Sequence, residues 1–161
     1  MKQNTISTKI KFIGILFIIL MTSIIVTTIY LNEKNKKDAL IINIAGKQRM
    51  LTQNISKNIF YLYNNKNTSF LELDSSTIEF IYNLSSLKKG NSLTGITKAP
   101  TDEIEKQLLK VETLWNIFNK NISDFKEVVQ KKDNSKEIIL KNIVEAIHTT
   151  NSILLFEVDT L

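Results

Sequence analysis

Twenty consecutive residues near the start of the chain, Phe12 to Leu31, carry no charged side chain. An apolar run of that length can span the ~30 Å hydrocarbon core of a bilayer as a helix. A cleaved signal peptide has a shorter apolar region of about 7–15 residues and a small-residue cleavage site. Here the run continues into TTIYLNEK, a poor cleavage site. We therefore expect an uncleaved transmembrane anchor at residues 12–31, and the 161-residue chain then has room for one further domain.

Basic residues flank this anchor on both sides. Residues 1–11 form a basic head with three lysines and no acid, whereas residues 32–38 contain three lysines together with Glu33 and Asp38. Because only Lys and Arg count strongly in the positive-inside rule, the two sides nearly tie and charge alone leaves the orientation open. No residue between Asn32 and Asp38 breaks a helix, so the anchor can continue into the next helix. Such a continuous helix fits a signalling rod and a simple tether equally well.

The segment Asp38–Tyr63 has two stripes at helical spacing. The first is mostly apolar and should face the core of a helical bundle. It consists of Leu40, Ile44, Gln48, Leu51, Ile55, Ile59 and Leu62. The second lies roughly opposite and repeats every ~3.5 residues, which is the spacing of a seam between two packed helices. It consists of Ala39, Ile42, Gly46, Arg49, Gln53, Ser56, Phe60 and Tyr63.

The middle of the second stripe holds Gly46, Arg49 and Gln53. A glycine inside a helix costs about 1 kcal/mol relative to alanine, and close approach of a second backbone or of a small ligand would explain it. Arginine offers a planar fork of donors that pairs with two oxygens at once, which makes a small anion the expected guest. The alternative is that Arg49 is a solvated surface residue and Gly46 a tolerated weak point. The spacing by itself leaves both interpretations open.

Three further amphipathic helices are expected, at Phe70–Lys89, at about Asp102–Lys131 and at about Ser135–Asp159. The connections between them are Asn64–Ser69, Asn91–Ala99 and residues 131–135. Gly90 should cap the end of one helix and Thr101 the start of the next. The expected core residues are Leu73, Ile78, Ile81, Leu84 and Leu87; Ile104, Leu108, Val111, Trp115, Phe118, Ile122, Phe125 and Val129; and Ile139, Ile143, Ile147, Leu154 and Val158, with Ile153 and Phe156 flanking. The sequence thus predicts an all-α protein, in which an N-terminal transmembrane helix precedes an antiparallel up-down four-helix bundle at residues 38–161.

The motif INIAGKQRMLTQNISK, residues 42–57, resembles the N-terminal sensory domain of type IV pili methyl-accepting chemotaxis transducers, the PilJ-type domain. It is more distantly similar to the P-box helix of NarX-type nitrate/nitrite sensor kinases. The segment LTGITKAPTDEIEKQLLKVETLWNIF, with its tryptophan Trp115, resembles the second half of the family, and the last helix fits more loosely. The resemblance runs from Asp38 to the C-terminus.

This resemblance implies a periplasmic four-helix bundle that dimerises through its first helices, with a cytoplasmic head at residues 1–11 and an anchor in the bacterial inner membrane. It also implies that Arg49 binds a small anion such as nitrate or nitrite at the dimer seam beside Gly46. Gln53 and, less directly, Asn43 are supporting donors. The chain departs from the nitrate sensors at Ile44, where they carry a lysine. It also ends at Leu161 without the family's second transmembrane helix and output module, so it is either a fragment or a sensor-like domain that signals through a chemoreceptor or kinase.

Other function classes find little support. The chain has no cysteine, and its net charge of +5 comes from scattered lysines rather than from a basic stripe, which argues against nucleic-acid binding. No nucleophile–base pair, phosphate loop or metal-ligand cluster is visible, so we expect no enzyme, metal or cofactor. The lone His148 is interpreted as structural, and the acids after Thr101 as helix-capping charges. Two classes remain: an anion-binding sensory domain, or a membrane-tethered helical interaction module without a small-molecule ligand.

Overall fold

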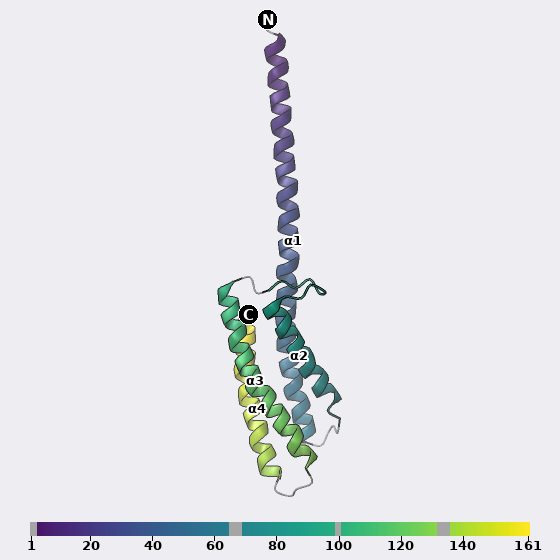
Figure 1. Cartoon of the computed structure of the whole chain (residues 1–161), viewed down its shortest axis with the longest axis vertical. Helices are drawn as coiled ribbons and strands as arrows, with labels where there is room; N and C mark the ends of the chain where they lie inside the picture. The colour runs from purple at the N-terminus through teal and green to yellow at the C-terminus, as the bar shows by residue number, and fades with distance from the viewer. Residues whose placement is uncertain (1–2, 65–68, 99–100, 132–135) are drawn as a thin grey trace. The chain divides into compact units, whose positions relative to one another are not determined.

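The computed structural model describes residues 3–64, 69–98, 101–131 and 136–161, with side chains from residue 6 onward. Within these ranges the structure consists of helices and short connections (Figure 1). The helices are α1 (Gln3–Tyr63), α2 (Leu71–Lys89), α3 (Asp102–Gln130) and α4 (Lys136–Asp159). The chain divides into two compact units, Met1–Ala39 and Leu40–Leu161.

The first unit is the N-terminal part of α1, which is long and apolar enough to cross a membrane. Two of its threonine hydroxyls donate to carbonyls one turn earlier, Thr22 to Ile18 and Thr28 to Ile24, each at 2.8 Å. Such bonds satisfy the hydroxyl groups within the helix itself, without a water molecule. The helix continues without interruption through residues 32–38, as the lack of a helix-breaking residue predicts.

In the second unit the later part of α1 runs antiparallel to α2. Gln48 Nε2 donates to the carbonyl of Phe80 at 3.1 Å, and Asn54 Nδ2 donates to Ser76 Oγ at 3.3 Å, so residue numbers rise along α1 as they fall along α2. The same reversal relates α2 to α3 through ion pairs at their two ends, Asp74 with Lys126 at 2.6 Å and Lys88 with Glu112 at 2.5 Å.

The last helix returns beside both α3 and α1. Gln107 Nε2 of α3 donates to the carbonyl oxygen of Glu157 at 2.7 Å, and Asp159 pairs with Arg49 of α1. Each helix is therefore antiparallel to its neighbours in the chain, and α4 closes the ring against α1. The prediction of an antiparallel four-helix bundle is confirmed.

The core follows the predicted stripes most closely on α1 and α3. On α1 every residue of the first stripe is buried except the partly buried Leu40, and on α3 only Ile104 and Val129 are partly rather than fully buried. Trp115 of α3 stacks on Phe80 of α2 with ring centroids 3.8 Å apart. The ring centroid of Phe118 lies 5.8 Å from that of Trp115. These rings form the centre of the α2–α3 contact.

The prediction of core residues was wrong at three positions. Ile78 and Ile81 of α2 are exposed, and Phe80 is fully buried in their place. Ile78 lies about 140° around the helix from the buried Leu73, so both side chains cannot face the same core. On α4 the predicted Ile139 is exposed, and its neighbour Leu140 is buried because it lies one heptad before Ile147 and so shares that residue's face.

The helix ends agree with the predicted caps. Gly90 caps α2 with φ 78°, and the Thr101 side chain accepts a hydrogen bond from the amide of Ile104 at 3.3 Å. The connection after α2 turns back on itself, and Asn91 and Ile96 bond to each other through both backbone groups. Residues 65–68, 99–100 and 132–135 lie outside the described residues, and so do parts of the three predicted connections and the predicted helix start at Ser135.

Candidate ligand-binding site

Most of the second stripe of α1 lies on the outward face of the bundle, but Ser56 and Tyr63 are partly buried. Gly46, Arg49 and Gln53 are all exposed, and the apolar residues on either side of them, Ile42 and Phe60, are 71% and 53% exposed. Ile42 and Phe60 lie on the same side of α1, about 27 Å apart along the helix.

Gly46 has free space around it. A Cβ built on this residue would have no neighbouring heavy atom within 4 Å. The bundle itself therefore does not require glycine here, since alanine would fit and would favour the helix by about 1 kcal/mol. Any requirement for glycine must come from something that approaches this face from outside the chain.

Arg49 reaches from α1 toward the end of α4. Its Nε atom lies 3.4 Å from Oδ1 of Asp159, and the two side chains are 56% and 42% exposed. An ion pair this open to solvent is worth at most about 1 kcal/mol, so the guanidinium can exchange partners easily.

The two supporting residues differ in their positions. Gln53 lies one turn after Arg49 on the same face, beside a shallow hollow of about 440 Å³ between Met50 and Lys57. Asn43 is exposed as well, but it lies about 120° around the helix from Arg49. The structure thus brings Gly46, Arg49 and Gln53 onto one face and leaves Asn43 to one side.

The departure at Ile44 falls in the core. Ile44 is only 8% exposed, about 160° around α1 from Gly46, so a cation at this position would point into its own bundle. The nearby Lys47 is paired with Glu79 of α2. Arg49 is therefore the cation in the middle of the outward stripe.

Sequence reasoning missed a groove between α1 and α4. Its volume is about 490 Å³, and its lining includes Ser56, Phe60, Ile147 and His148. His148 is exposed at this groove rather than packed in the core. No motif marks the groove, because it forms only where two helices distant in sequence meet. Only the exposed Phe60, which also ends the second stripe, hints at it.

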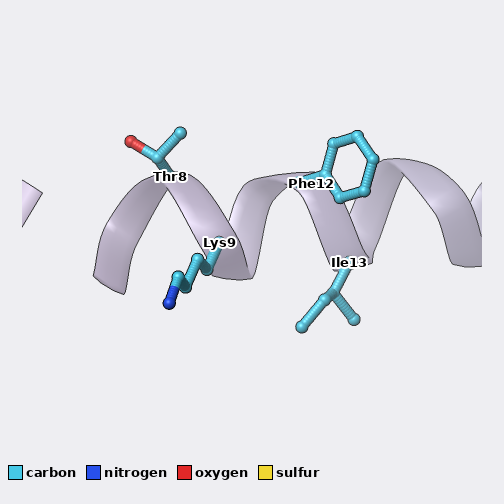
Figure 2. A pocket seen from close by; sticks show the side chains of 4 residues that line it. All are labelled: Thr8, Lys9, Phe12 and Ile13. Carbon is cyan, nitrogen blue, oxygen red and sulfur yellow. The ribbon is translucent and has the colours of Figure 1, made fainter. Parts of the chain in front are cut away.

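Two other hollows are less suited to a ligand. One, of about 390 Å³, is lined by Thr8, Lys9, Phe12 and Ile13, and Figure 2 shows these side chains diverging from a single helix. The other lies between α2 and α3, where Lys88 and Glu112 pair across it. Among the described residues no group of three or more acidic or histidine side chains could hold a metal ion.

Residues 30–141, more than half of the chain, match the family model of the type IV pili methyl-accepting chemotaxis transducer N-terminal domain, PilJ. The chain belongs to the PilJ family. The matched part of this PilJ domain includes Gly46, Arg49 and Gln53. The PilJ fold is similar to a solved structure, the ligand-binding domain of the Pseudomonas aeruginosa nitrate receptor McpN. The two chains are 20% identical with a TM-score of 0.58, and the match covers 74% of this chain and 87% of the other. The search of curated proteins gives no match.

Membership of the PilJ family makes this chain a sensory domain of the chemoreceptor type. Domains of this family sense signals and do not catalyse reactions. The motif that carried the family resemblance, residues 42–57, thus forms the outward face of α1 on one side and the bundle core on the other.

Proposed function

We propose that this PilJ domain senses a small oxyanion, such as nitrate or nitrite, that binds between the Arg49 side chains of two copies of the chain. The observation that carries this proposal is the charge of α1. From Ala39 to Tyr63 the helix has no acidic residue, and Arg49 stands exposed in the middle of its outward face. The acids that pair with Lys47 and Arg49 come from α2 and α4, so this part of α1 itself presents only positive charge to an approaching anion.

The residues around Arg49 suit a small planar anion. The guanidinium donates two parallel hydrogen bonds to two oxygens, which selects a compact oxyanion over a simple point charge. Gly46, one turn earlier and without a side chain, would let the second helix and the anion come close. Gln53, one turn later, supplies an amide donor from the same face, and Asn43 is a more peripheral donor.

A switch follows from the charge of the empty site. Two guanidiniums that approach each other across a two-fold axis repel, because each is only weakly neutralised by its solvent-exposed pair with Asp159, and an anion between them removes that repulsion. The anion therefore binds more tightly when the two α1 helices are packed closely together than when they are separated. Such a difference in affinity is what a ligand needs to shift a conformational equilibrium.

The likeness to the nitrate receptor domain supports the choice of ligand to test first. At 20% identity that likeness shows the fold alone, so nitrate is the first probe rather than an assignment. Ile44 is buried where the resemblance implies a lysine, so this chain has one basic contact fewer and nitrate is tested beside other oxyanions.

The membrane arrangement belongs to the same proposal. Residues 12–31 anchor the chain in the bacterial inner membrane, residues 1–11 stay in the cytoplasm, and the bundle from residue 38 onward faces the periplasm. Binding is then reported through a membrane partner, either a chemoreceptor or a sensor kinase, because the bundle itself is a non-catalytic sensor.

The test is isothermal titration of the full chain in lipid nanodiscs with nitrate, nitrite, chlorate and sulfate. We expect binding of at least one monovalent oxyanion. Arg49→Ala should weaken it at least tenfold, since a hydrogen bond to a charged group contributes about 1.5–3 kcal/mol. Arg49→Lys should restore only part of the affinity, because lysine keeps the charge and loses the fork.

Lys57→Ala is the matched control, since it removes the same charge from another exposed position of α1, about 12 Å along the helix and about 80° around it from Arg49. Affinity that falls equally in Lys57→Ala and Arg49→Ala would mean that general charge, and not a site at Arg49, attracts the anion.

The α1–α4 groove favours a second candidate function, a membrane-tethered interaction module. Its lining is largely apolar, and Ile42 and Phe60 expose further apolar surface on the same side of α1. No heat with any anion, together with a monomeric chain in detergent by sedimentation, would favour this module over the sensor.

A further inference from the structure

The partner of Arg49 comes from the far end of the chain. Because α1 carries no acid from Ala39 to Tyr63, the carboxylate that neutralises Arg49 is supplied by another helix, and it is Asp159 in the last turn of α4. The neighbouring Val158 is 2% exposed, so the end of α4 is fixed in the core directly beside this ion pair.

The geometry leaves the arginine free to bind a second group. Asp159 lies against Nε, at 3.4 Å, whereas the end of the guanidinium fork is formed by its two terminal nitrogens. An anion can therefore approach the fork while Asp159 is still nearby. The two negative charges then repel each other across a few ångströms, so that the anion and Asp159 compete for one cation.

We propose that Asp159 is a built-in competitor for the anion site: it holds Arg49 toward α4 when the site is empty and releases it when an oxyanion binds. This inference rests on the proposed function, because it assumes that Arg49 binds the anion. Its consequence is a coupling between the seam of α1 and the last turn of α4. By linkage, whatever loosens the Arg49–Asp159 pair strengthens anion binding, and anion binding loosens the pair.

The experiment compares nitrate and nitrite titrations of the full chain in nanodiscs for the wild type and two substitutions of Asp159. Asp159→Asn removes the competing charge and should strengthen anion binding about two- to fivefold. This factor corresponds to the free energy that exposed ion pairs typically contribute. Asp159→Glu keeps a carboxylate within reach and should bind close to the wild type. Unfolding midpoints measured alongside confirm that the variants remain folded.

Glu145→Gln is the matched control for charge. Glu145 is also an exposed acid of α4, about 21 Å along the helix from Asp159, so its removal changes the net charge equally without touching Arg49. We expect its affinity to equal that of the wild type.

Each outcome decides one of the two proposals. The competitor role of Asp159 is supported if Asp159→Asn binds the anion more tightly than the wild type and Glu145→Gln does not. It is also supported if Asp159→Asn binds the anion and the wild type does not. Wild-type binding that Asp159→Asn leaves unchanged or weakens overturns the competitor and keeps the anion sensor. An equal gain in Glu145→Gln also overturns it, because general charge then explains the effect. If neither the wild type nor Asp159→Asn binds, the anion site fails and the competitor fails with it.

Discussion

At the scale of single residues, the proposed anion site places different demands on two residues of α1. It requires the charge and the planar fork of Arg49, and it requires that Gly46 has no side chain. The structure separates these demands from stability, because neither residue is packed in its own bundle: Arg49 is more than half exposed and Gly46 has open space around it. Substitutions at these positions can therefore test binding without unfolding the protein.

Gly46→Ala should raise stability and lower anion affinity together. Alanine fits the open space and favours the helix by about 1 kcal/mol. Its methyl group would, however, hold the second helix and the anion away from Arg49. Urea denaturation followed by circular dichroism measures the first effect and titration with nitrate the second. Unchanged affinity in this variant would mean that no close approach occurs at Gly46.

Gly90 presents the opposite case, because the fold itself requires glycine there. Its φ of 78° and ψ of 161° lie in a region that is essentially restricted to glycine, and an added Cβ would lie 3.1 Å from the backbone nitrogen of Lys98. We expect Gly90→Ala to lower the free energy of unfolding by about 1–3 kcal/mol from strain alone, with the contact adding to it.

Gly95→Ala serves as the comparison for Gly90→Ala. Gly95 has a similar φ of 74° but no atom within 4 Å of an added Cβ. Gly95→Ala should therefore lower the free energy of unfolding, measured by urea denaturation, by less than Gly90→Ala. A loss in Gly95→Ala as large as that in Gly90→Ala would show that the contact with Lys98 adds nothing.

At the scale of elements, the α2–α3 contact is organised by aromatic stacking. Trp115 lies on Phe80 with ring centroids 3.8 Å apart, and both side chains are buried. The sequence showed that Trp115 belongs to the core, since it falls on the long apolar stripe of α3. The prediction for α2 chose Ile78 and Ile81 instead of Phe80, although Phe80 shares the helical spacing of the buried Leu73, Leu84 and Leu87.

Trp115→Ala should destabilise the bundle by about 3–5 kcal/mol, because it removes a large buried ring and leaves a cavity beside Phe80. The measurement is urea denaturation of the chain in mild detergent, followed by circular dichroism. Ile117→Ala, two residues further on the exposed side of α3, should change stability by no more than about 0.5 kcal/mol. Similar losses in both variants would contradict the assigned packing of α3.

At the scale of the whole molecule, the proposed function predicts an orientation in the membrane and a pairing of two copies. The chain has no native cysteine, so introduced cysteines can be labelled without background. Leu93→Cys places a thiol at a residue that is 95% exposed in the connection after α2, and Ser7→Cys places one in the basic head. A membrane-impermeant maleimide added to spheroplasts should label the first at once and the second only after lysis. The reverse pattern would place the bundle in the cytoplasm.

The pairing of copies makes a separate prediction. Ile42→Glu puts a charge in the proposed seam, and we expect it to abolish self-association of the full chain in detergent, measured by sedimentation velocity. Ile78→Glu is the control, because Ile78 is similarly exposed, at 67%, on a different helix. If both variants associate like the wild type, the stripe of α1 is not the seam.

The sequence by itself determined the helices, the apolar run and the two faces of Asp38–Tyr63, because each of these depends on residue spacing along one helix. The family resemblance rested on the same local motif. Tertiary structure decided what spacing along one helix cannot express: that Trp115 stacks on Phe80 between α2 and α3, and that a groove forms where α1 meets α4. It also decided that Asp159, more than a hundred residues from Arg49 in the chain, lies beside its guanidinium. These contacts join residues far apart in sequence, and only the packing of α1, α2, α3 and α4 against one another brings them together.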